Sequence, residues 1–114
     1  MKVLTDLQLA SAIRNALEAA RDRLTAEFPV DRIVLFGSVV RREADEESDV
    51  DLLIVLTERP TQEIRDRITS LILDINLQHD TNLSELIVDR ETWDHGLPSV
   101  LPIHQEIEEE GIRL

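Results

Sequence analysis

Cysteine is absent from the 114-residue chain, which excludes disulfide frameworks, zinc–thiolate sites and thiol nucleophiles and fits a reducing interior. Aromatic residues are only 3% of the sequence, too few for a platform that stacks nucleic-acid bases. No apolar run approaches the roughly 20 residues needed to cross a bilayer, and no basic segment precedes an apolar one at the N-terminus. We therefore expect a soluble cytoplasmic protein without membrane contact.

Basic residues are also scarce. Twelve Lys and Arg against 24 Asp and Glu give a net charge of −12. Affinity for phosphate backbones comes mainly from basic groups, so direct nucleic-acid binding is disfavoured. A basic protein partner fits this charge better, although acidity that serves solubility alone remains the alternative.

What is present suffices for one folded unit. A mass of 13.0 kDa and 42% hydrophobic residues support a single core, so residues 1–114 are expected to form a single domain. We find no repeat, linker or low-complexity segment.

Hydrophobic spacing predicts six main elements. A capping box at Thr5–Gln8 starts the first helix, and Gly111 closes the last one. The expected elements are helix 6–27, strand 33–36, strand 50–56, helix 61–78, strand 83–88 and helix 99–110. This order predicts a mixed α/β (α+β) fold, a small mixed β-sheet with helices packed on it. Trp93 is expected to pack the turn after the third strand.

Two carboxylates stand at the entrance of the second predicted strand. Asp49 and Asp51 are two residues apart, so both side chains project from the same face, roughly 6–7 Å apart along the backbone. A hard divalent cation would offset their mutual repulsion, and magnesium prefers carboxylate oxygens, waters and phosphates. When such a pair stands alone, a solvated strand end is the more common explanation.

Gly37 and Ser38 precede this pair and end the first predicted strand. Glycine lets the backbone approach a phosphate closely, and free N–H groups with the Ser38 hydroxyl would seat an anionic triphosphate. An ordinary strand-to-helix turn is the alternative for these two residues.

The three histidines give no sign of a metal site. His79, His95 and His104 lack metal-ligand spacing and are expected to have surface or structural roles.

Together the motifs resemble the nucleotidyltransferase superfamily of the DNA polymerase beta type, and within it the minimal nucleotidyltransferase (MNT) proteins. The residues that carry the resemblance are Gly37, Ser38, Arg41, Ser48, Asp49, Asp51 and Leu52. Arg42 departs from the family pattern, which commonly has glycine there. The resemblance covers most of the chain and implies a nucleotidyltransferase fold.

The resemblance also implies a two-metal reaction with Mg²⁺ as cofactor and ATP as nucleotide donor. Asp49 and Asp51 would bind the metal, with a third carboxylate on the neighbouring strand. Glu85 is the candidate for that third metal-binding and catalytic position, and Asp89 is the reserve. Gly37, Ser38 and Arg41 would bind the nucleotide, although Arg41 can equally pair with acids of its own loop.

Three functions follow from this resemblance. The first is an MNT antitoxin that transfers AMP from ATP to a helical HEPN-type toxin, in a homo- or hetero-oligomer. The second is a stand-alone enzyme that nucleotidylates a small molecule such as an aminoglycoside. The third is a non-catalytic antitoxin that acts by binding alone.

Overall fold

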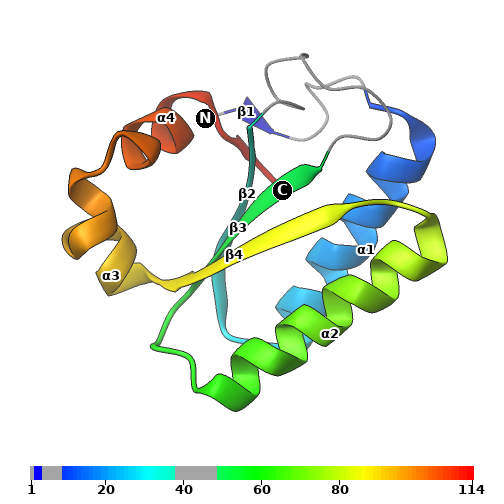
Figure 1. Ribbon diagram of the computed structural model, residues 1–114, viewed down its shortest axis with the longest axis horizontal. Helices are drawn as coiled ribbons and strands as arrows, with labels where there is room; N and C mark the ends of the chain where they lie inside the picture. Colours follow the sequence, from blue (N-terminus) through cyan, green and yellow to red (C-terminus); the bar gives the residue numbers. More distant parts are fainter. Residues whose placement is uncertain (1, 4–8, 38–48) are drawn as a thin grey trace.

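The computed structural model describes residues 2–3, 9–37 and 49–114, and their strands form one mixed sheet (Figure 1). The elements are, in chain order, β1 (Lys2–Val3), α1 (Ser11–Glu27), β2 (Val30–Phe36), β3 (Val50–Leu56), α2 (Gln62–His79), β4 (Leu83–Asp89), α3 (Arg90–His95), η2 (Leu97–Val100), α4 (Pro102–Glu110) and β5 (Ile112–Arg113). The strand order is β1-β5-β2-β3-β4. The predicted mixed sheet with packed helices is confirmed.

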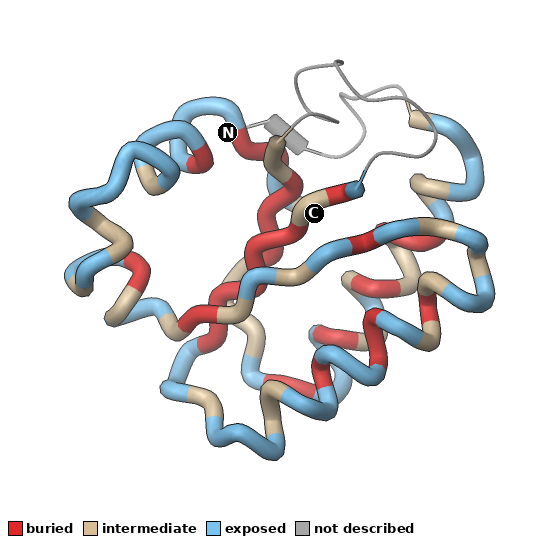
Figure 2. The backbone as a smooth tube through the Cα atoms, viewed as in Figure 1, coloured by how far each residue is buried: buried red, intermediate tan, exposed pale blue. Residues whose placement is uncertain are grey.

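Strand β3 lies between an antiparallel and a parallel neighbour. It pairs with β2 antiparallel and with β4 parallel. Residues 52–56 are all buried, because helices cover both faces of the sheet at this strand, and such strands read as continuous apolar runs. Figure 2 shows this buried band running through the middle of the molecule.

Two helical layers divide the core between the faces of the sheet. On one face, α1 and α2 pack over a cluster that includes Leu52 and Ile54. On the other face, the segment from α3 to α4 packs Trp93 and Ile107 against Leu53 and other strand residues. The side chains of β3 therefore alternate between the two clusters, as strand geometry requires.

Helix α2 forms as predicted. The Thr61 hydroxyl accepts a hydrogen bond from the Ile64 backbone N–H at 3.2 Å, which satisfies one free donor of the first turn. Its buried residues are Ile68, Leu71, Ile72 and Ile75, the spacing of one helical face.

Helix α1 begins later than the predicted residue 6. Ala10 has a non-helical ψ of 144°, and the helix begins at Ser11. The capping box at residues 5–8 lies outside the described residues.

The sequence prediction missed the shorter elements. Helix α3 has six residues and buries only Trp93, so it is too short to show a hydrophobic period. The last helix begins at Pro102 rather than at residue 99, after the short helix η2. Gly111 ends it, as predicted, but in an extended conformation with φ −63°. A Cβ there would lie 2.4 Å from the Ile107 carbonyl oxygen, so close packing requires the glycine.

Asp89 caps α3, and we expect its replacement by alanine to destabilise the fold by about 1 kcal/mol at pH 7. Its carboxylate accepts a hydrogen bond from the Thr92 backbone N–H at 3.0 Å, and the bonds from Thr92 lower the pKa of Asp89. Because folding lowers the pKa of Asp89, its charged carboxylate stabilises the fold at pH values above the unfolded pKa of about 4. This stability is lost as the pH falls through the folded pKa. The deficit of Asp89→Ala in urea unfolding should therefore shrink in acid. Asp89→Asn, which keeps an acceptor, should retain most of the stability; an equal loss in both variants would contradict the cap.

No helix within the described ranges is both long and apolar enough to cross a membrane.

Candidate functional site

Asp51 lies in a row of side chains that crosses three strands. Its register partners are Phe36 of β2 and Ser84 of β4. Laterally paired residues point to the same face of a sheet. Asp51 therefore faces the side that α3 and α4 cover further along the strands, where Leu53 and Val55 are buried.

The helices leave the Asp51 end of this face uncovered in the described part of the chain. Ser84 is exposed, and Leu86, the next β4 residue on this face, is 44% exposed. At the far end of the same face, Val88 and Trp93 are buried. Within the described ranges, this face is therefore covered at its α3 end and exposed on β4 next to Asp51.

Asp49 and Asp51 influence each other electrostatically. Burial raises the pKa of Asp51, and the nearby charge of Asp49 raises the pKa further. Asp49 precedes β3 and is exposed, whereas Asp51 is half-buried. A hard divalent cation bound at the two carboxylates would remove the penalty that Asp49 places on the charged form of Asp51.

Gly37 lies directly against Asp51 of this pair. Its φ is +84°, a backbone conformation that favours glycine. A Cβ built on Gly37 would lie 2.5 Å from Oδ2 of Asp51. Glycine therefore both permits the turn at the end of β2 and lets the Asp51 carboxylate lie against the backbone. The predicted nucleotide-binding residues Ser38 and Arg41 lie outside the described residues.

The structure does not bring Glu85 onto the face of Asp51. In the parallel register of β3 and β4, Glu85 pairs with Leu52, whose side chain belongs to the α1–α2 cluster. Ser84 instead lies beside Asp51. The expectation of a metal site shared by Glu85, Asp49 and Asp51 disagrees with this register, because alternation depends on how the strands pair. Asp89 lies at the far end of β4, where it caps α3.

Gly37→Ala should weaken the site and the fold together. The positive φ disfavours alanine by roughly 1–2 kcal/mol, and the new Cβ would displace the Asp51 carboxylate. We expect a melting temperature below that of the wild type. We also expect the shift in melting temperature on adding Mg²⁺ to be at least tenfold smaller than the shift in the wild type. Gly111→Ala, at the other crowded glycine, is the matched control and should lower stability without weakening the Mg²⁺ effect. An unchanged Mg²⁺ effect in Gly37→Ala would contradict a role of Gly37 in positioning the Asp51 carboxylate for a cation.

Asp51→Asn should stabilise the metal-free protein at neutral pH. Because folding raises the pKa of Asp51, the native state is more stable with this carboxyl protonated than with it charged. The contribution to stability is present in acid and is lost as the pH rises through the folded pKa. In EDTA at pH 7 the variant should melt above the wild type, and the gap should close as the pH falls below about 4. A variant that melts lower than the wild type at pH 7 would disprove the destabilising role of the charge.

An open sheet end with two adjacent carboxylates and a glycine at positive φ defines a candidate site for a divalent cation and an anionic ligand. The sequence of residues 14–93 matches the family model of the nucleotidyltransferase domain, which covers more than half of the chain. The protein therefore belongs to the nucleotidyltransferase domain family.

One curated protein and one solved structure are similar to this chain. A protein of Methanocaldococcus jannaschii, named as a candidate protein adenylyltransferase, is 41% identical over 58 residues, 51% of this chain. The matched region spans only 59% of the length of that curated relative. A solved structure described as a candidate minimal nucleotidyltransferase has a TM-score of 0.62 at 24% identity, and the match covers 90% of this chain and 92% of that chain. This structural likeness shows the shared fold.

Proposed function

We propose that this protein is a metal-dependent protein adenylyltransferase that uses ATP and Mg²⁺. The observation that carries the proposal is the pair Asp49 and Asp51 at an open sheet end, with Gly37 directly against Asp51. Asp49 and Asp51 would hold the metal, which supplies charge neutralisation for the nucleotide phosphates when bound. The reduced set of two carboxylates replaces the three expected from the sequence.

The remaining residues of the open end position the reactants. Gly37 lets the backbone at the end of β2 lie against the Asp51 carboxylate, and exposed Ser84 lies beside Asp51 on β4. The acceptor hydroxyl attacks the α-phosphorus of ATP; the new O–P bond forms, the bond to the bridging oxygen breaks, and pyrophosphate leaves. The hydroxyl proton passes to solvent or to a nearby carboxylate. Ser38 and Arg41 remain the proposed nucleotide contacts.

The acceptor in this proposal is a hydroxyl of a protein partner. The name of the Methanocaldococcus relative points to protein adenylylation, and the net charge of −12 suits a basic partner. We propose a HEPN-type toxin as this partner, which would make the protein an antitoxin that acts by covalent modification. The competing functions are transfer to a small molecule such as an aminoglycoside and neutralisation by binding alone.

Incubation with α-labelled ATP, Mg²⁺ and the co-encoded neighbouring protein tests the proposal. We expect label on the neighbour, none with Asp49→Asn/Asp51→Asn, and none after EDTA treatment. Replacing the neighbour with an aminoglycoside tests the small-molecule alternative in the same assay. No label on any acceptor, or equal label with the double variant, would refute the transferase; neutralisation of the neighbour by an inactive double variant would support binding alone.

A further inference from the structure

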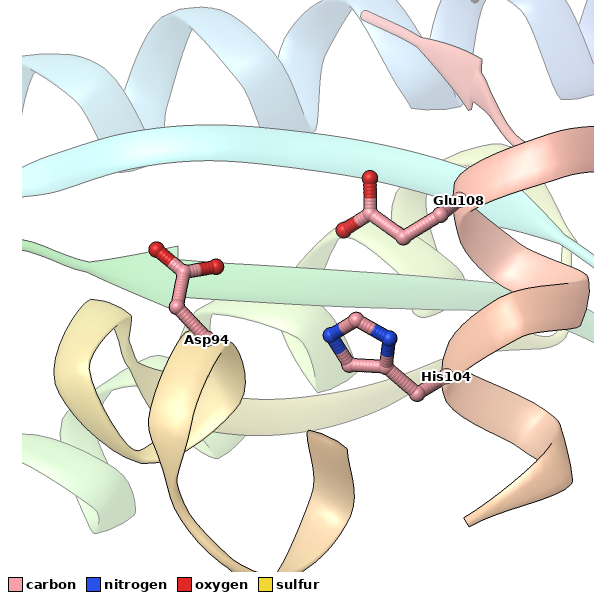
Figure 3. A group of neighbouring side chains, drawn as sticks. All are labelled: Asp94, His104 and Glu108. Carbon is pink, nitrogen blue, oxygen red and sulfur yellow. The ribbon is translucent and has the colours of Figure 1, made fainter. Parts of the chain in front are cut away.

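Three side chains that can bind a metal gather at the other end of the sheet, on α3 and α4. They are Asp94, His104 and Glu108, and one donor atom from each lies within 4.8 Å of the others. Figure 3 shows the imidazole and the two carboxylates pointing toward one another. His104 and Glu108 are four residues apart on α4, a spacing that places them on one helix face.

The imidazole of His104 is held in place but leaves a nitrogen unused. Its ring stacks on Trp93 with centroids 4.5 Å apart and an angle of 30° between the planes. Its Nε2 is buried and has no hydrogen-bond partner among the described residues. A buried polar nitrogen without a partner is costly, and a bound cation is one way to satisfy it.

The two carboxylates are oriented by neighbours that use only one oxygen of each. Trp93 Nε1 donates a hydrogen bond to Glu108 Oε1 at 2.8 Å. Arg32 Nη2 donates to Asp94 Oδ1 at 3.2 Å and lies 3.7 Å from Glu108 Oε1. Asp94 Oδ2 and Glu108 Oε2 take no part in these contacts. Hydrogen-bonded ligands of this kind are typical of protein metal sites.

The charge of the surrounding cluster also suits a cation. Arg32 and Arg90 pair with Asp31 in addition to the contacts of Arg32 with Asp94 and Glu108. Two guanidinium groups and three carboxylates give 2 − 3 = −1, so the two arginines leave the cluster negative. A divalent ion would therefore meet a net attraction.

We propose that Asp94, His104 and Glu108 form a binding site for a zinc-class divalent ion, with water as the fourth ligand. One imidazole nitrogen and two carboxylate oxygens fit such an ion better than magnesium, which prefers an all-oxygen shell. Zinc ligands at roughly 2.0–2.2 Å lie about 3.5 Å apart, so the side chains must close by about 1 Å. The ion would tie α3 to α4 over the sheet.

This site is separate from the proposed catalytic pair. Arg32 pairs in register with Val55 near the end of β3, whereas Asp51 lies at the start of that strand. Zinc binding at α3 and α4 therefore neither requires nor implies nucleotide transfer.

Zinc titration of the full chain carrying Asp49→Asn/Asp51→Asn tests the proposal, since this background lacks the other proposed metal ligands. We expect one equivalent of Zn²⁺ by calorimetry and a Co²⁺ spectrum typical of a low-coordinate site. Adding His104→Gln should weaken Zn²⁺ binding at least about 100-fold, because direct ligands matter at least as much as their supporting partners. His95→Gln, an exposed histidine on α3, is the matched control and should bind Zn²⁺ normally.

Glu108→Gln provides a second variant if His104→Gln fails to fold. The glutamine keeps an acceptor for Trp93 Nε1 and removes the ligand charge, so the fold should persist and Zn²⁺ binding should weaken at least about tenfold. No stoichiometric binding in the Asp49→Asn/Asp51→Asn background overturns the site. Binding that survives both His104→Gln and Glu108→Gln, or that His95→Gln also abolishes, overturns it as well.

Discussion

Replacing Asp51 with asparagine is expected to slow nucleotide transfer by about 1000-fold. A metal ion stabilises transition-state charge by several kcal/mol, and each 1.4 kcal/mol is a factor of ten in rate. Asp51 is the half-buried member of the pair, and Gly37 lies against its carboxylate. Exposed Asp49 therefore cannot place its own carboxylate at the same position. The measurement is single-turnover transfer of label from α-labelled ATP at saturating Mg²⁺.

Glu85→Gln is the matched control for this prediction. It also removes one carboxylate charge from the sheet, on β4 next to β3, but on the face of Leu52 rather than on the face of Asp51. We expect its rate to stay within about threefold of the wild type, a difference below 1 kcal/mol. If Glu85→Gln loses as much activity as Asp51→Asn, the two-carboxylate site is wrong and the three-carboxylate prediction from the sequence stands.

Replacing Trp93 with alanine is expected to destabilise the protein by about 3–5 kcal/mol, the range for deleting a large buried aromatic ring. Trp93 is only 1% exposed and joins Leu53, Val55 and Ile107 in one cluster. It also donates the hydrogen bond to Glu108 and stacks on His104. Urea unfolding of the metal-free protein measures the loss.

Trp93→Phe separates the packing of the ring from its hydrogen bond. Phenylalanine keeps most of the apolar contact and the ring stack but cannot donate to Glu108. We expect it to cost about 1–3 kcal/mol, the usual range for a bond to a charged acceptor together with a smaller ring. A loss from Trp93→Ala below 1 kcal/mol would show that the α3–α4 layer contributes little to the stability of the sheet.

The sequence predicted the elements whose periodicity is strong. Strand β3 and helix α2 were placed within about one residue, because a continuous apolar run and a capped, one-sided helix are local properties. Trp93 was expected to pack the turn after the third strand; it is buried directly after β4, but in a short helix that the sequence did not predict. Helix α3 and strand β5 are too short to produce a period, so tertiary packing alone reveals them.

The sequence by itself shows that the chain has no cysteine, which excludes thiol chemistry. It also contains the pair Asp49 and Asp51, which indicates a carboxylate metal site. A spacing of two residues at the start of a strand predicts that Asp49 and Asp51 project from one face. In the structure, Asp51 lies on β3 and Asp49 directly precedes it. Strand register is a tertiary property, so only the structure could place Ser84 rather than Glu85 beside Asp51. For the same reason, only the fold brings His104, dismissed by spacing alone, together with Asp94 and Glu108.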